Sequence, residues 1–111
     1  MKKVKVLSMT AVSVLHAVDE GYGYGFDIMD ATELPSGTVY PILGRMLKSG
    51  LVRSRWEQST VARREKRPPR RYYDMTSQGK AALAEAVRHY QTLGGRLTLG
   101  AADPGHERAE A

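Results

Sequence analysis

Basic side chains gather in one segment of this 111-residue chain, between residues 53 and 71. The segment holds eight Lys and Arg against Glu57 and Glu65, a net charge of +6. The whole chain carries +5, so the rest of it is near neutral at −1. Such a segment could remain a solvated loop, but clustered charge of one sign also attracts polyanions. We expect contacts with the phosphates or the minor groove of double-stranded DNA from Arg63, Arg64, Lys66, Arg67, Arg70 and Arg71.

A second group of hydrogen-bonding residues lies in and before a predicted helix that begins near residue 35. Ser36 and Thr38 can donate to phosphates or base edges, and Gly37 lets the backbone approach an anion at the positive end of the helix dipole. Plainer alternatives stay open, because Ser36 could cap the helix, and Tyr40 and Tyr24 could simply pack. The sequence predicts DNA contact at Tyr24, Ser36, Gly37, Thr38, Tyr40 and Arg45.

Residues able to do catalysis or bind a metal form no recognisable pattern. His16, His89 and His106 are far apart in sequence, and none has the spacing of metal ligands. The chain has no Cys, which excludes disulfides and thiolate sites, and no Ser stands in a G-x-S-x-G setting. The glycines at 21, 23 and 25 lack the spacing of a nucleotide loop. We therefore expect no enzyme activity, no cofactor and no metal.

Apolar residues at three- and four-residue steps predict the helices that position these side chains. A first helix is expected over residues 4–18 and a short second one over residues 24–32. A third is expected over residues 35–49, with Pro35 as its first residue and Gly50 as its stop. The predicted buried faces include Val14, Leu15, Val18, Ile28, Val39, Leu43 and Met46.

Two strand-like runs flank the basic loop, over residues 51–56 and 71–75. They predict a β-hairpin with a long, flexible, basic tip. Three helices followed by strand, basic loop and strand is the order of a winged helix-turn-helix, which we expect over residues 1–76. The expected fold class is mainly α with a small β-hairpin.

A fourth helix is expected over residues 77–93, capped by Thr76 or Ser77 and ended by the glycine pair at 94 and 95. Small and polar residues follow, so residues 94–111 are predicted to be a disordered tail. The apolar stripe of the helix consists of Ala82, Leu83, Ala86, Val87 and Tyr90.

Four stretches of the chain resemble the PadR family of bacterial transcriptional regulators in order and spacing. They are Tyr22-Gly23-Tyr24-Gly25, Gly37-Thr38-Val39-Tyr40-Pro41-x-Leu43-x-Arg45, Gly50-Leu51-Val52 and Arg70-Arg71-Tyr72-Tyr73-x-Met75-Thr76-x-x-Gly79. The resemblance covers about residues 4–90. It implies a winged-helix homodimer that represses transcription from a palindromic operator. It also implies a DNA-facing role for Tyr24, Ser36, Thr38 and Tyr40, a place near the backbone for Arg45, and a wing that ends at Arg70-Arg71.

The resemblance makes the fourth helix the dimerisation element, with Leu83, Val87 and Tyr90 toward the partner. Many relatives have His at the position of Tyr22, and often a charged residue at that of Leu47. Some members of the family respond to phenolic acids or flat hydrophobic drugs at the dimer interface. Release from DNA by a small hydrophobic or phenolic ligand is therefore a further expectation. His89 and Tyr90 could line such a pocket, whereas we expect Trp56 to pack on the wing.

The N-terminus superficially resembles a signal peptide, with three Lys before an apolar stretch, but polar residues interrupt that stretch and Asp19-Glu20 follow it. No run approaches the ~18–20 apolar residues of a membrane span. We expect a cytoplasmic protein without a membrane partner. The competing interpretation is a winged helix that acts as a protein-interaction module for an acidic partner.

Overall fold

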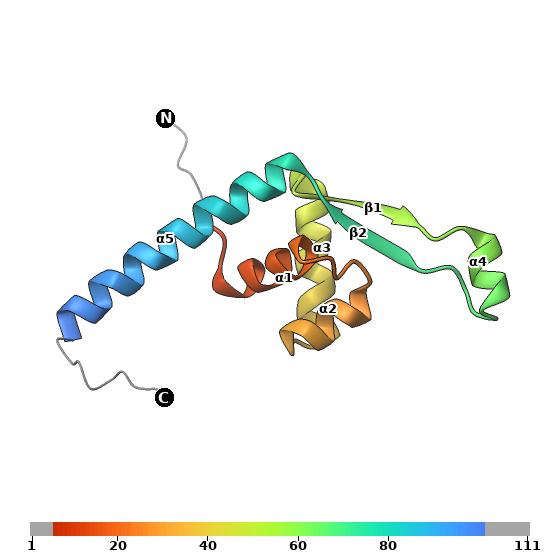
Figure 1. Cartoon of the computed structure of the whole chain (residues 1–111), viewed down its shortest axis with the longest axis horizontal. Coiled ribbons are helices and arrows are strands. Elements are labelled where there is room, and N and C mark those ends of the chain that lie inside the picture. The colour runs from red at the N-terminus through yellow and green to blue at the C-terminus, as the bar shows by residue number, and fades with distance from the viewer. Residues whose placement is uncertain (1–5, 102–111) are drawn as a thin grey trace.

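Helices make up most of the chain, and the computed structural model describes residues 6–101, with side chains through residue 95. The elements are α1 (Met9–Asp19), α2 (Gly25–Thr32), α3 (Ser36–Ser49), β1 (Val52–Trp56), α4 (Ser59–Arg64), β2 (Arg71–Met75) and α5 (Ser77–Ala101). Figure 1 shows α1, α2 and α3 in the body of the molecule, the hairpin projecting to one side and α5 to the other. The expected fold class is confirmed.

The side chain of Ser8 sets the start of α1. Its backbone is extended, and its hydroxyl oxygen accepts a hydrogen bond from the N–H of Ala11 at 3.1 Å. This satisfies one of the N–H groups that the first turn of a helix leaves open. The helix therefore begins at Met9 and not at residue 4, where the apolar periodicity placed it. Residues 4 and 5 lie outside the described residues.

Pro35 and Gly50 delimit α3. Pro35 has an extended backbone and stands at the N-cap, one position before the place expected for it. Gly50 adopts a left-handed conformation (φ 77°), and the N–H of Leu51 donates to the carbonyl of Met46 at 2.9 Å, which closes the helix as predicted. Pro41 lies inside α3, which nevertheless runs on to Ser49.

The three helices of the body share one apolar core. Its largest fully buried side chains are Val14 and Leu15 of α1, Ile28 of α2, and Val39 and Leu43 of α3. All five are positions that the periodicity assigned to buried faces. Full burial of a side chain of this size stabilises the fold by about 1.5–3 kcal/mol relative to exposure. The core therefore fixes how α3 lies against the other two helices.

The hairpin, residues 52–75, is called the wing below. Its strands are antiparallel, with Val52 opposite Met75 and Trp56 opposite Arg71. Val52 and Tyr73 are buried in the core, which anchors the base of the wing to the body.

The junction between the wing and α5 is close-packed. The Thr76 hydroxyl lies 2.6 Å from the carbonyl oxygen of Gly50 and accepts a hydrogen bond from the N–H of Gly79 at 2.9 Å. Thr76 therefore caps α5, one of the two caps expected. A Cβ on Gly79 would strike the carbonyl oxygen of Leu51, so this close passage requires glycine.

Two segments differ from the sequence expectations. The wing tip, residues 57–70, is not a plain flexible loop, because α4 forms there and buries Ala62 to 2% exposure. A six-residue polar helix has no apolar periodicity that could reveal it.

At the other end of the chain, α5 passes through the glycine pair to Ala101. Glycine inside a helix costs only about 1 kcal/mol relative to Ala, which does not force a stop. Residues 94–101 are thus helical, and residues 102–111 lie outside the described residues.

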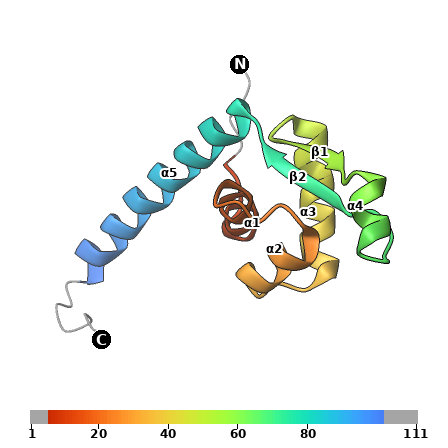
Figure 2. The same ribbon diagram turned by 45° about the vertical axis from the view of Figure 1, so that its right-hand side comes forward.

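Described side chains of α5 within residues 83–90 contact the body. Leu83 and Ala86 are buried, and the Tyr90 hydroxyl donates to the carbonyl of Leu7 at 2.7 Å. Figure 2 shows the later turns extending beyond the helices of the body. Within residues 6–101, no helix is both long and apolar enough to cross a membrane.

Candidate nucleic-acid interface

An open cleft of about 450 Å³ separates α3 from the end of the wing tip. Tyr24, Gly25 and Tyr40 form one side, and residues 67–71 with Tyr73 form the other. The helix and the basic loop that the sequence assigned to DNA contact therefore lie on the same side of the molecule. A cleft edged by arginine and tyrosine suits a phosphate, because it combines positive charge with hydrogen-bond donors.

Tyr24 connects the body to the wing. The residue pairs with Tyr72 in an isolated antiparallel bridge, and the neighbouring carbonyl of Gly23 accepts from the N–H of Tyr73 at 2.8 Å. Its ring lies edge-on to Phe26, with centroids 5.4 Å apart, and the Arg70 guanidinium sits 4.3 Å from its centre. The packing alternative therefore describes the ring of Tyr24, which supports Arg70 at the edge of the cleft.

Tyr40 fills the space left by a missing side chain. Its hydroxyl lies against the Cα of Gly25, so close that a Cβ there would overlap it. Burial raises the pKa of the Tyr40 phenol, and the nearby Tyr73 and Tyr24 raise it further. The hydroxyl therefore stays protonated at physiological pH, able to donate to an anion in the cleft. The residue is 39% exposed, so it both packs and remains accessible.

The first turn of α3 presents open donors. Pro35 occupies the cap position with no side-chain cap, so Ser36 is the first helical residue and does not cap the helix. The N–H groups of Thr38 and Val39 both donate to the carbonyl of Pro35 at 3.0 Å. The backbone N–H groups of Ser36 and Gly37 precede them and have no helical acceptor. Ser36 and Gly37 are exposed and Thr38 is half-buried.

Arginines of the wing lie over aromatic rings. The guanidinium of Arg55 is 5.0 Å from the centre of Tyr72, and that of Arg71 is 5.9 Å from the centre of Trp56. Arg71 also donates to the hydroxyl of Ser54 at 3.0 Å. Cation–π contacts and hydrogen bonds restrict these long side chains. Trp56 is 65% exposed, so the structure gives it a contact with Arg71 but not the packing on the wing that was expected.

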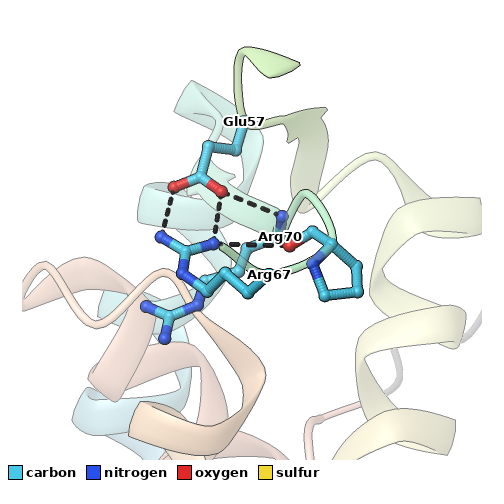
Figure 3. Close-up of polar contacts among 4 residues, drawn as sticks. Glu57, Arg67 and Arg70 are labelled. Carbon is cyan, nitrogen blue, oxygen red and sulfur yellow. Dashed lines mark hydrogen bonds and ion pairs between the residues drawn. The ribbon is translucent and has the colours of Figure 1, made fainter. Parts of the chain in front are cut away.

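Glu57 holds Arg67 inside the wing tip (Figure 3). The two guanidinium nitrogens Nη1 and Nη2 of Arg67 donate to the carboxylate at 2.5 and 2.8 Å, and the backbone N–H of Arg70 donates at 3.2 Å. The hydrogen bond from Arg67 is the main cause that lowers the pKa of Glu57 to about 2. Burial opposes the shift, while the Arg70 N–H and the charges of both arginines favour it. The charge of Arg67 is therefore neutralised within the wing.

Three other cations of the wing tip face water. Arg63 and Arg64 end α4, and Lys66 follows with a left-handed backbone (φ 56°). All three are exposed, and in the described part of the chain their side chains make no hydrogen bond or ion pair. Arg45, on α3, is exposed as well.

Glu57 is the functional candidate that the sequence interpretation missed, since it was counted only as a negative charge. The hairpin register would have revealed it. Because Trp56 is opposite Arg71, the next pair outward is Glu57 and Arg70, and the N–H of Glu57 indeed donates to the carbonyl of Arg70 at 2.7 Å.

The family of the chain follows from its sequence. A model of the transcriptional regulator PadR-like family matches residues 14–85, well over half of the chain. The chain belongs to this family. The resemblance carried by the four motifs is thereby confirmed, and family members are transcriptional regulators and not enzymes.

Solved structures of two PadR regulators and of one other DNA-binding protein share the fold. One from Clostridium difficile superposes with a TM-score of 0.72 at 19% identity, over 86% of this chain and 100% of that one. One from Bacillus cereus gives 0.65 at 22%, over 79% and 86%. Bordetella bronchiseptica BpsR, whose DNA binding is regulated by 6-hydroxynicotinic acid, gives 0.65 at 18%, over 83% of this chain and 65% of BpsR. No curated protein matches the chain.

The three residues that the resemblance assigned to a dimer of this PadR-like regulator lie in different surroundings. Leu83 is 7% exposed and belongs to the core of its own chain, and the Tyr90 hydroxyl is bonded to Leu7. Val87 is 38% exposed, as is Leu93 further along α5. Among the described side chains of α5, Val87 and Leu93 are the large exposed apolar ones. Leu47, at a position often charged in relatives, is partly buried against the core.

Proposed function

We propose that this chain is a repressor that binds operator DNA through α3 and the wing. The observation that carries the proposal is the cleft between Tyr40 of α3 and residues 67–71 of the wing. A winged helix that places one helix in the major groove leaves a phosphate strand between that helix and the wing. Arginine and tyrosine donors stand at that place here.

The residues have three direct roles in DNA binding, and Arg67 has an indirect one. Ser36 and Thr38 present small hydroxyl side chains to base edges and phosphates, and Ser36 and Gly37 present open backbone N–H groups. Within the cleft, a backbone phosphate is bound by Tyr40, Arg70 and Arg71, and Tyr24 supports Arg70. The phosphates further along the duplex are contacted by Arg45, Arg63, Arg64 and Lys66. Arg67 acts indirectly, through its pairing with Glu57.

The DNA-bound form is a homodimer on a palindromic operator. Exposed apolar side chains on α1 and α5, namely Met9 (59%), Val87 and Leu93, support an apolar contact between copies. A twofold axis through that contact places two α3 helices on successive major grooves, about 34 Å apart. In the cytoplasm, this dimer acts as a repressor because it binds over a promoter and blocks transcription.

The last part of the proposal is that a small hydrophobic or phenolic ligand, bound at the α5 interface, releases the protein from DNA. The rings of His89 and Tyr90 lie edge to face with centroids 4.9 Å apart, which offers a surface for a flat molecule. The ligand regulation of BpsR supports looking for such a compound.

A gel shift with the DNA upstream of the gene tests the function. A specific complex that survives excess random competitor is expected, with a steep loss of affinity as salt rises. The absence of any shift, together with capture of an acidic protein, would instead support the interaction-module alternative.

A further inference from the structure

Glu57 holds together the neck of the wing tip, which is the place where its first and last residues, Glu57 and Arg70, lie side by side. It follows directly after β1, and its N–H donates to the carbonyl of Arg70 at 2.7 Å, while the Arg70 N–H donates back to its carboxylate at 3.2 Å. With the paired bonds from Arg67, the carboxylate accepts three hydrogen bonds, and its side chain is only 9% exposed (Figure 3). One acidic side chain thus joins both ends of the tip.

The tip beyond this neck is folded onto itself. Inside it the Arg67 N–H donates to the carbonyl of Ala62 at 3.1 Å, and Ala62 is buried. At the neck, the Arg70 guanidinium lies over the Tyr24 ring, and its Nε is buried without a hydrogen-bond partner among the described residues. A buried donor without an acceptor is costly, so the position of the Arg70 side chain depends on the contacts that hold it there.

We propose that Glu57 is a positioning residue for DNA binding. It holds Arg67 and the Arg70 backbone so that the Arg70 guanidinium stays over Tyr24 at the cleft, ready for a phosphate. The inference rests on the proposed function and adds one claim: an acidic residue in a basic wing strengthens DNA binding. Electrostatics alone predicts the opposite effect on DNA affinity, because removing a negative charge near DNA favours association.

A matched pair of variants distinguishes a loss of operator affinity from a gain. Glu57→Gln and Glu65→Gln each remove one negative charge from the wing tip. Glu65 is exposed, and within the described part of the chain its side chain makes no hydrogen bond or ion pair. We expect operator affinity to fall about tenfold with Glu57→Gln, the scale of one charge-assisted hydrogen bond, and to stay level or rise with Glu65→Gln. Equal affinities for the two variants would overturn the proposal.

A double-mutant cycle asks whether Glu57 acts through Arg70. If it does, Glu57→Gln costs little in an Arg70→Ala background, because the group that it positions is gone. A full tenfold loss in that background would contradict action through Arg70. Trypsin gives a readout without DNA: cleavage after Arg63, Arg64 and Lys66 should be several-fold faster in Glu57→Gln than in Glu65→Gln. Unchanged cleavage and unchanged affinity would together exclude the positioning role.

These measurements separate the inference from the function on which it rests. A wild-type chain that binds no DNA, yet shows the trypsin difference, would refute the repressor proposal and leave only the ordering of the wing tip by Glu57. A wild-type chain that binds its operator, with Glu57→Gln at least as tight, would refute the role of Glu57 alone.

Discussion

The hydroxyl of Tyr40 rests directly against the Cα of Gly25, so that the first residue of α2 touches the side of α3 that we propose to face DNA. This meeting point lies in the cleft, beside Tyr24 and Tyr73. The contact explains why residue 25 is glycine, because only a residue without Cβ leaves room for the Tyr40 phenol. No special backbone conformation has to be invoked. The orientation of Tyr40 toward the proposed phosphate site thus depends on the absence of one methyl group.

Gly25→Ala should therefore destabilise the chain and weaken DNA binding together. The new Cβ must displace Tyr40, and such overpacking costs about 1–3 kcal/mol. Chemical denaturation measures the free energy of unfolding, and a gel shift measures the affinity. Gly44→Ala is the matched control, since a Cβ there meets nothing within 4 Å on an exposed part of α3. It should stabilise the helix by up to about 1 kcal/mol. Equal stabilities for the two variants would refute the packing argument.

Replacing Arg63, Arg64 and Lys66 with Ala should weaken binding to operator and random DNA alike. These side chains are exposed cations without a protein partner in the described residues, so their proposed contacts are with phosphates. The slope of log affinity against log salt should shrink by about 0.9 for each phosphate that the variant no longer neutralises. Thr38→Ala, at the start of α3, should instead reduce the preference for operator over random DNA. An unchanged slope in the triple variant would remove the wing tip from the interface.

The sequence predicted the body of the fold because apolar spacing reports burial directly. Val14, Leu15, Ile28, Val39 and Leu43 are buried as expected. It could not predict α4 or the length of α5. In α4 the Ala62 carbonyl accepts from the backbone N–H of Arg67, a contact that no apolar pattern reports, and in α5 two glycines form a stop signal that the helix passes through.

The candidate site was predicted in outline and not in its individual pairings. Charge counting located the wing, and the placement of Tyr40 and Arg70 at one cleft agrees with it. Counting could not show that Arg67 is paired with Glu57, because that pairing depends on how the tip folds back. For the same reason it could not show that Leu83 belongs to the core of its own chain.

Val87→Glu should dissociate the proposed dimer while leaving the monomer folded. The side chain is 38% exposed in a single chain, so a charge there meets water unless a partner covers it. Sedimentation velocity at micromolar concentration should show a monomer, and circular dichroism should show unchanged helix content. Leu83→Ala provides the contrast, because removal of this core side chain should cost about 2–5 kcal/mol of stability, as other Leu truncations do. A Val87→Glu dimer of wild-type stability would place the interface elsewhere.

The titration of Glu57 should report its partners in the wing tip. Its pKa in the folded chain is about 2, below the ordinary 4.5, with the hydrogen bond from Arg67 as the largest cause. A depressed pKa means that the pairing contributes to stability above about pH 4.5 and that this contribution is lost as pH falls through about 2. Between about pH 5 and 8 it is constant.

The side-chain carboxyl carbon of Glu57, followed by NMR, should show its midpoint near 2 in the wild-type chain. Arg67→Gln should raise that midpoint toward 4.5, although not fully, because the Arg70 N–H still donates to the carboxylate. Arg64→Gln removes the same charge from the wing tip without touching Glu57, so its midpoint should remain near that of wild type. If the two glutamine variants titrated alike, diffuse wing charge, and not the paired hydrogen bonds of Arg67, would be holding the carboxylate ionised.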